Sequence, residues 1–300
     1  MLEAIKIVVR PFYSALHFVL HKTLVANPLV SKKIILSHIR LEQETNPELD
    51  SRIIDLLNEY RIKNKSYQID LPQFKKYLSE TNYSTNYYGG NSVHSEFLEK
   101  ALEHFVSLQL ILLNSESVII DIGSANSPFC KIVTQKSGTQ FSYSQDKIFK
   151  HGLHENKIGG LASDLPFGDE SVDAITLHCS LEHFEGTQDK DFFREAERVL
   201  KKGGKCIVLP LYLSSQYTIH LDPISNLLKS YSPDISDDKD AVVRHCDSKQ
   251  YFSRHYDVKA FSARIVNNPN LLEAEILHVE NFKEVNKDCY LRFIGVFTKK

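Results

Sequence analysis

The chain lacks the features that mark several specialised protein classes. It has five cysteines, an odd number, and no two of them form a C-x-x-C pair, so neither a disulfide framework nor a zinc ribbon is indicated. A membrane-spanning helix needs a run of about 18 apolar residues or more, and no apolar run in this sequence is that long. The net charge of -2 gives no argument for nucleic-acid binding. We therefore expect a cytoplasmic protein with reduced cysteines and no secretory signal.

The composition is that of a globular chain with one large domain and an extension. Of the 300 residues, 42% are hydrophobic and 25% are charged, which provides ample material for a core. Residues 1–40 are rich in basic side chains and repeat apolar residues with a period near 3.6, which predicts a helix. This helix either packs on the main domain or makes a peripheral contact with an anionic membrane surface. We assign residues 1–85 to a helical N-terminal extension.

The remaining chain is organised around a short apolar run and the small-residue turn that follows it. Residues 118–122 predict a strand that is buried on both faces. Gly123 permits a sharp turn, and Pro128 suits the first turn of a helix. Strand, turn and helix in this order form the ligand crevice of open α/β sheets. The dinucleotide fingerprint G-x-G-x-x-G is absent, because Ala125 and Ser127 stand where further glycines would be.

Strands and helices alternate after this turn. A strand at 140–145 ends at Asp146, about 20 residues after Gly123, where doubly wound nucleotide sites place an acid against the ribose hydroxyls. Two further apolar runs, at 174–178 and 206–209, flank an amphipathic helix. This β-α-β-α-β alternation predicts a mostly parallel sheet.

Four blocks in this region resemble a class I S-adenosylmethionine-dependent methyltransferase of the small-molecule type. They are Val118–Gly123, Gln145-Asp146, Leu165–Ile175 and Arg194–Gly204, and Cys179–Gly186 also resembles a block of sugar- and glycan-cluster methyltransferases. The resemblance implies an α/β, Rossmann-like, doubly wound fold with a mostly parallel seven-stranded sheet and an antiparallel closing strand. The methyltransferase domain would cover residues 86–300, with residues 213–250 as an insertion that forms a substrate lid.

The same resemblance implies S-adenosyl-L-methionine as the cofactor and suggests which residues hold it. Asp121, Gly123 and Ala125 would surround the methionine portion, Asp146 the ribose, and Ala162 the adenine, with Asp164 nearby. Two positions differ from the family pattern. Ala125 replaces the usual second glycine, and Leu161 stands where many relatives place an acid, with Asp164 three residues later.

The chemistry of methyl transfer suggests candidates for a general base. Transfer from a sulfonium is an in-line displacement that depends on orientation, and a hydroxyl acceptor must also lose its proton. Residues just past the strand ends face the crevice, so His178 is the first candidate, His183 the second and Asp222 a third. For each of these residues the alternative to a catalytic role is a structural one, in which the side chain only forms a hydrogen bond within the folded protein. We expect no metal site, because His178, Cys179 and His183 lack a fourth ligand.

The sequence therefore predicts an enzyme that methylates a small-molecule acceptor. A hydroxyl of a saccharide or related metabolite is the favoured target, glycan and lipid-linked acceptors included. The alternative is a catalytically inactive module that keeps the methyltransferase fold and binds a partner. These two hypotheses differ in whether S-adenosylmethionine binds at all.

Overall fold

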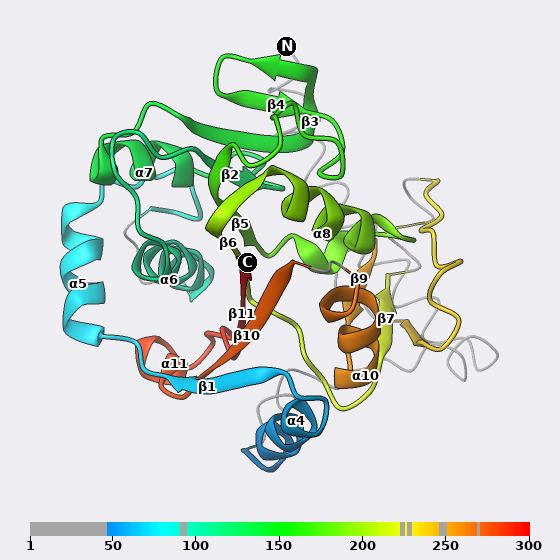
Figure 1. Ribbon diagram of the computed structural model, residues 1–300. Coiled ribbons are helices and arrows are strands. Elements are labelled where there is room, and N and C mark those ends of the chain that lie inside the picture. Colours follow the sequence, from blue (N-terminus) through cyan, green and yellow to red (C-terminus); the bar gives the residue numbers. More distant parts are fainter. Residues whose placement is uncertain (1–46, 91–94, 223–225, 227–229, 246–250, 269–270) are drawn as a thin grey trace.

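The computed structural model describes residues 47–90, 95–222, 226, 230–245, 251–268 and 271–300. Its centre is an eight-stranded sheet in the order β1-β10-β11-β6-β5-β2-β3-β4 (Figure 1). The strands are β1 (Lys63–Tyr67), β2 (Ile119–Ile122), β3 (Ser142–His154), β4 (Lys157–Gly159), β5 (Val172–His178), β6 (Leu200–Leu209), β10 (Leu272–Val279) and β11 (Phe293–Lys299). The predicted segment 1–40 lies outside the described residues.

The pairing of the strands confirms the expected fold class. β11 is antiparallel to both of its neighbours, β10 and β6, and the other pairs are parallel, except that the end of β3, residues 152–154, folds back antiparallel to β4. This is the mostly parallel, doubly wound sheet with one antiparallel closing strand. The sheet has eight strands, however, and not the expected seven.

The additional edge strand, β1, comes from a segment whose polar sequence showed no strand pattern. β1 pairs in parallel with β10, and two exposed ion pairs connect the strands: Lys63 to Glu273 at 2.9 Å and Lys65 to Glu275 at 2.8 Å. An edge strand of this kind owes its conformation to its partner, because its own residues bury little apolar surface. β1 therefore ties part of the predicted helical extension directly to the central sheet.

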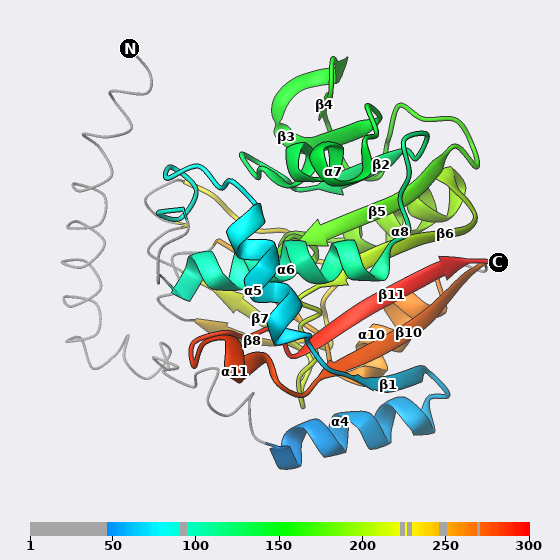
Figure 2. The ribbon, with the colours of Figure 1, turned by 90° about the vertical axis from the view of Figure 1, so that its left-hand side faces the viewer.

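Helices cover both faces of the sheet (Figures 1 and 2). On one face lie α5 (Leu71–Glu80), α6 (Ser95–Leu110) and α7 (Phe129–Ser137); on the other lie α4 (Pro47–Glu59), α8 (Gln188–Val199) and α10 (Val258–Phe261). β2 is buried at every position: Ile119 packs in the core between the sheet and α5 and α6, and Ile120 in the core between the sheet and α4 and α8. Because helices cover both faces of the sheet, every residue of this strand except Asp121 is apolar.

An insertion after β6 forms a second, smaller sheet. It contains β7 (Thr218–Leu221), β8 (Val242–His245) and β9 (Ser253–His255) in the order β8-β7-β9. A π-helical turn, Ser262–Val266, and a short helix, α11 (Phe282–Val285), complete the chain around β10. Among the described residues, none of the helices is both long and apolar enough to cross a bilayer.

Candidate functional site

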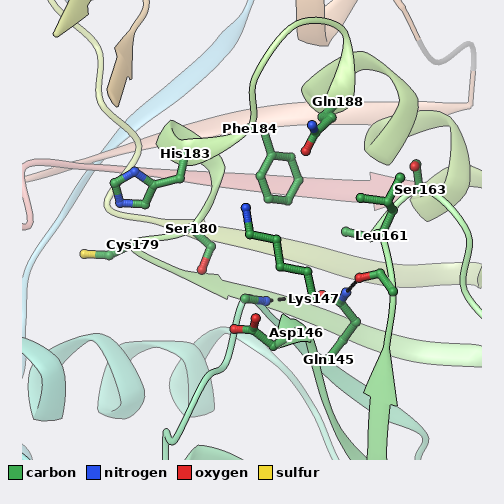
Figure 3. A pocket seen from close by; sticks show the side chains of 13 residues that line it. Gln145, Asp146, Lys147, Leu161, Ser163, Cys179, Ser180, His183, Phe184 and Gln188 are labelled. Atoms are coloured by element: carbon green, nitrogen blue, oxygen red, sulfur yellow. Dashed lines mark hydrogen bonds between the residues drawn. The ribbon is translucent and has the colours of Figure 1, made fainter. Parts of the chain in front are cut away.

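The main candidate site is a pocket at the carboxyl ends of β2, β3 and β5 (Figure 3). Its cavity volume is about 180 Å³, and it opens to solvent. Its lining residues are Gly123, Gln145, Asp146, Lys147, Gly160, Leu161, Ala162, Ser163, Cys179, Ser180, His183, Phe184 and Gln188. β3 and β5 lie on opposite sides of β2, so the pocket sits where the chain reverses its direction of winding.

The turn after β2 needs a glycine at position 123. Gly123 has φ +66°, and a Cβ atom there would lie 2.6 Å from Ser180 Oγ. Ser180 cannot easily move away, because its hydroxyl donates to the Ile122 carbonyl at 2.9 Å. The turn therefore presents bare backbone to the pocket, as a site for close approach of a ligand requires.

Asp146 closes the turn from the neighbouring strand. Its Oδ2 atom accepts a hydrogen bond from the backbone N–H of Ala125 at 2.8 Å, and Oδ1 accepts one from the N–H of Ile148 at 3.0 Å. Ala125 adopts φ +43°, a conformation that costs a residue with a Cβ about 1–2 kcal/mol. The bond to Asp146 helps to hold it there. Each carboxylate oxygen keeps a further lone pair with which to accept a ligand hydroxyl.

Gln145 is a site residue that the sequence analysis did not single out. Its amide nitrogen donates to the Gly160 carbonyl at 2.7 Å, and its amide oxygen accepts from the Gly123 N–H at 3.3 Å. The side chain thus connects the turn after β2 to the loop that follows β4 (Figure 3). Its position directly before Asp146, in a block already associated with the cofactor, was the available signal.

Two residues predicted beside the adenine lie in different places. Ala162 lines the pocket together with Leu161, and Leu161 and Ser163 stand on the side opposite Cys179 and His183 (Figure 3). Asp164 is exposed and is not among the lining residues. Asp164 thus lies outside the pocket that Leu161 and Ala162 line.

Asp121 and His178 form a buried pair behind the turn, and neither lines the pocket. Asp121 Oδ1 accepts from Thr176 Oγ1 at 2.9 Å and lies 2.8 Å from His178 Nδ1. The other ring nitrogen, Nε2, lies 2.9 Å from Ser107 Oγ, and the His178 side chain is only 6% exposed. Both of its ring nitrogens are engaged within the protein, so neither is free to take a proton from an acceptor in this arrangement.

His183 has the opposite arrangement. It lines the pocket, and its side chain is 40% exposed. Its Nδ1 atom lies 2.7 Å from the carbonyl oxygen of Phe252, which can only accept, so Nδ1 carries the proton. In the neutral ring Nε2 then has a lone pair, and its neighbour Glu182 places Oε1 3.7 Å away.

The remaining candidate, Asp222, follows β7 and is fully buried. It is not one of the lining residues, so the structure does not bring it together with the other predicted site residues. Among the residues that the structure describes, no group of three or more His, Cys, Asp or Glu side chains is placed to hold a metal ion.

The residues of the pocket fit a nucleoside sulfonium. A carboxylate with free lone pairs, Asp146, faces the cavity beside the side-chain-free Gly123, and Leu161 and Phe184 provide apolar walls for a flat ring. Lys147 also points into the cavity (Figure 3). Because its side chain is long and the residue is exposed, it can turn outward when a ligand enters.

Comparisons with known proteins agree with this geometry. Residues 120–208 match the family model described as a methyltransferase domain. The uncharacterized protein MJ1123 of Methanocaldococcus jannaschii is 37% identical over 90 residues, which are 30% of this chain and 42% of that protein. The chain thus spans less than half the length of this relative. The family match confirms the methyltransferase resemblance over residues 120–208, and S-adenosylmethionine is the cofactor of this domain.

Solved structures with a similar fold include two methyltransferases. The S-adenosylmethionine dependent methyltransferase from Mesorhizobium loti has a TM-score of 0.42 and 15% identity, over 66% of this chain and 98% of that chain. The geranyl diphosphate C-methyltransferase from Streptomyces coelicolor, solved with Mg²⁺, geranyl diphosphate and S-adenosyl-L-homocysteine, has a TM-score of 0.43 and 12% identity, over 85% and 99% of the two chains.

Proposed function

We propose that this protein transfers a methyl group from S-adenosylmethionine to a hydroxyl of a small molecule, a saccharide or a related metabolite. The observation that carries the proposal is the single pocket shared by Gly123, Asp146, Ala162 and His183. The first three were expected to hold the cofactor, and the fourth was expected to act on the acceptor. They come from four separate segments of the chain, yet they line one cavity.

Each of these residues has a definite task in the proposed reaction. The bound cofactor supplies a methyl group made electrophilic by the sulfonium. Asp146 accepts hydrogen bonds from the ribose hydroxyls, and such charge-assisted bonds are worth roughly 1.5–3 kcal/mol. The adenine ring lies against Leu161, Ala162 and Phe184, at the end of the pocket opposite His183. Gln145 keeps the two loops at a fixed distance, which maintains the alignment on which an in-line displacement depends.

His183 is the general base in this proposal, in preference to His178. Its Nε2 atom accepts the proton of the acceptor hydroxyl as the new oxygen–carbon bond forms. The Phe252 carbonyl fixes the tautomer in which Nε2 is able to do so. His178 instead contacts Ser107 and Asp121, and it supports the turn from behind.

The insertion between β6 and the end of the chain contributes to the same side of the pocket. Phe252, which holds His183, precedes β9, and the ring of His255 in β9 stacks on Tyr212 with centroids 4.6 Å apart. These contacts are made by residues 212, 252 and 255, which flank the segment 213–250, and they support the proposal that this segment covers the acceptor. An insertion of this kind excludes water from the reacting atoms.

Titration calorimetry with S-adenosylmethionine and with S-adenosylhomocysteine tests the proposal. We expect saturable binding of both compounds to the full-length protein. An inactive module that only keeps the fold would show no heat at high micromolar cofactor. The acceptor is then identified by mass spectrometry of a cell extract after incubation with the enzyme and methyl-labelled cofactor.

A further inference from the structure

An acidic and aromatic group of side chains adjoins the pocket at the Cys179 end. We call it the acidic subsite; it consists of Glu99 and Glu103 from α6, Glu182 from the 3-10 turn Leu181–His183, Tyr212 after β6 and Tyr290 before β11. Cys179 connects it to the pocket that it lines. Its thiol donates to Glu103 Oε1 at 3.3 Å and lies 3.6 Å from Tyr290 Oη.

Two of the three carboxyl groups of the acidic subsite have their negative charge neutralised within the protein. Lys100 places its ammonium 3.0 and 3.2 Å from the two oxygens of Glu103. Burial, and then the neighbouring Glu103, raise the pKa of Glu99 to about 8, so Glu99 is largely protonated at neutral pH. Its Oε2 atom also accepts from the N–H of Tyr290 at 3.0 Å.

Within the described part of the chain, the carboxyl group of Glu182 has no comparable ion pair with a lysine or arginine. Only 4% of the residue is exposed, and among the described residues its Oε2 atom has no hydrogen-bond partner. Its Oε1 atom lies 3.7 Å from His183 Nε2. A buried carboxylate oxygen without a donor is costly, by several kcal/mol in a protein interior. A bound group that brings a positive charge and N–H donors would remove this cost.

Two tyrosine rings stack on each other near Cys179, at the same end of the pocket. Tyr212 stacks on His255, and its ring centroid lies 6.5 Å from that of Tyr290. Burial raises the pKa of Tyr212 well above its ordinary value, with Cys179 and Glu182 adding to the effect; Tyr212 therefore stays neutral and lies within the field of Glu182. Neutral aromatic rings together with a buried carboxylate in one cluster are a favourable environment for an organic cation.

We propose that the acidic subsite binds an ammonium group of the methyl acceptor, with Glu182 Oε2 as its hydrogen-bond acceptor and Tyr212 as its aromatic neighbour. This inference rests on the proposed function and specifies its substrate class, a hydroxylated small molecule that also carries an amine, such as an amino sugar or an amino alcohol.

The first test divides a small-molecule cell extract on a cation exchanger at pH 5. The full-length protein and methyl-labelled S-adenosylmethionine are incubated with the retained and with the unretained fraction. We expect methylated product from the retained fraction, which contains the amines. Product formed only from the unretained fraction overturns the inference and leaves the proposed function intact. No product from either fraction overturns it too, and binding of S-adenosylhomocysteine then decides whether the proposed function also fails.

The second test is Glu182→Gln, which keeps the side chain's size and removes its charge. At a limiting amount of the retained fraction we expect product formation to fall about tenfold or more, since the charge-assisted bond is lost. The affinity for S-adenosylhomocysteine should stay within twofold. A parallel loss of that affinity would show that Glu182 serves the amino group of the cofactor, and unchanged product formation would remove Glu182 from the subsite.

Glu284→Gln, in the short helix α11, is the matched control, because Glu284 is exposed and is not among the pocket residues. It should alter neither quantity. Melting temperatures of both variants show whether a loss of product reflects loss of fold. The divided extract tests the inference on the unaltered protein, so it remains decisive if Glu182→Gln does not fold.

Discussion

The contrast between the two histidines shows how much a single hydrogen bond decides at the scale of the residue. His178, the last residue of β5, and His183, in the turn Leu181–His183 that follows, are five positions apart. One has its two ring nitrogens occupied by Asp121 and Ser107. The other has only Nδ1 occupied, by a backbone carbonyl. The protonation state of a neutral imidazole follows from such partners, so only His183 offers a basic nitrogen to the pocket.

Substituting each histidine by alanine separates these roles. His183→Ala should lower turnover about 10²- to 10⁴-fold, the usual contribution of a general base, while the affinity for S-adenosylhomocysteine stays the same. His178→Ala should instead lower the melting temperature, because it leaves the buried Asp121 with one partner fewer. Both are measured by label transfer, calorimetry and thermal melting. Full turnover in His183→Ala would exclude it as the base.

Two glycines provide a matched test of the turn after β2. In Gly123→Ala the new methyl group would lie 2.6 Å from Ser180 Oγ at a positive φ, whereas a Cβ on Gly168 meets no atom within 4 Å. We expect Gly123→Ala to destabilise the protein by more than about 1 kcal/mol, since the residue cannot adopt this backbone without strain, and to weaken cofactor binding. Gly168→Ala should change neither by a measurable amount. Equal melting temperatures for the two variants would contradict the steric argument.

Asp146 and Asp164 were both expected at the cofactor from the sequence, and the structure distinguishes them. Asp146 lines the pocket and Asp164 does not. Asp146→Ala should weaken the binding of S-adenosylmethionine about tenfold or more, through the loss of charge-assisted hydrogen bonds. Asp164→Ala should leave the dissociation constant unchanged. Calorimetry of the two variants gives both values, and a loss of affinity in Asp164→Ala would place it in the site after all.

At the scale of the element, an ionic network joins the insertion to α8. Arg254 in β9 is fully buried and pairs with Asp238 at 2.8 Å and Asp189 at 3.2 Å. Arg264 holds Asp189 from the other side at 2.8 Å. Asp189 lies in the first turn of α8, where an acid commonly interacts with the helix dipole. In the structure its main partners are these two arginines, which fix the start of α8 beside η1 (Leu181–His183), the turn that carries His183.

This network predicts a large difference between a buried and an exposed arginine. Arg254→Met should destabilise the protein by about 3 kcal/mol or more, because it leaves buried carboxylates without their partner. Arg194→Met is the control: Arg194 pairs with Asp191 at 2.7 Å, but its side chain is 58% exposed, so its loss should cost less than about 1 kcal/mol. Urea unfolding of the two variants measures both changes. Similar midpoints would mean that the insertion is held by other contacts.

At the scale of the whole molecule, the buried carboxyl of Glu99 makes stability depend on pH. Its pKa in the folded protein is raised to about 8, first by burial and then by Glu103, whereas in the unfolded chain it is near its ordinary value of about 4.3. Between these two pH values the folded state binds one more proton than the unfolded state. The free energy of unfolding therefore decreases as pH rises through this window.

Glu99→Gln should remove this part of the pH dependence. We expect the variant to gain stability relative to the unaltered protein as the pH approaches 8, because glutamine needs no proton to remain neutral. Glu96→Gln, on the exposed side of the same helix, should follow the unaltered protein across the range. Urea unfolding at several pH values provides the test. Parallel curves for all three proteins would show that Glu99 does not bind the extra proton.

The sequence alone was sufficient for the α/β class, the parallel sheet, the turn at Gly123 and the approach of Asp146 to that turn, although β3 continues to His154 and does not end at Asp146 as expected. These features depend on local signals: an apolar run with a glycine after it, and a spacing set by one helix and one strand. The physical reason is that residues close in the chain, or at equivalent strand ends, reach the same edge of a parallel sheet whatever else the molecule does.

Only the tertiary structure decided which histidine has a basic nitrogen, where the insertion attaches and which strand forms the edge of the sheet beside β10. The carbonyl of Phe252 sets the tautomer of His183. Asp189 forms ion pairs with Arg254 and Arg264, and β1 is extended because it pairs with β10. Each of these depends on a partner far along the chain. Burial and hydrogen bonding determine charge and protonation, and neither can be read from a sequence until the fold has brought the partners together.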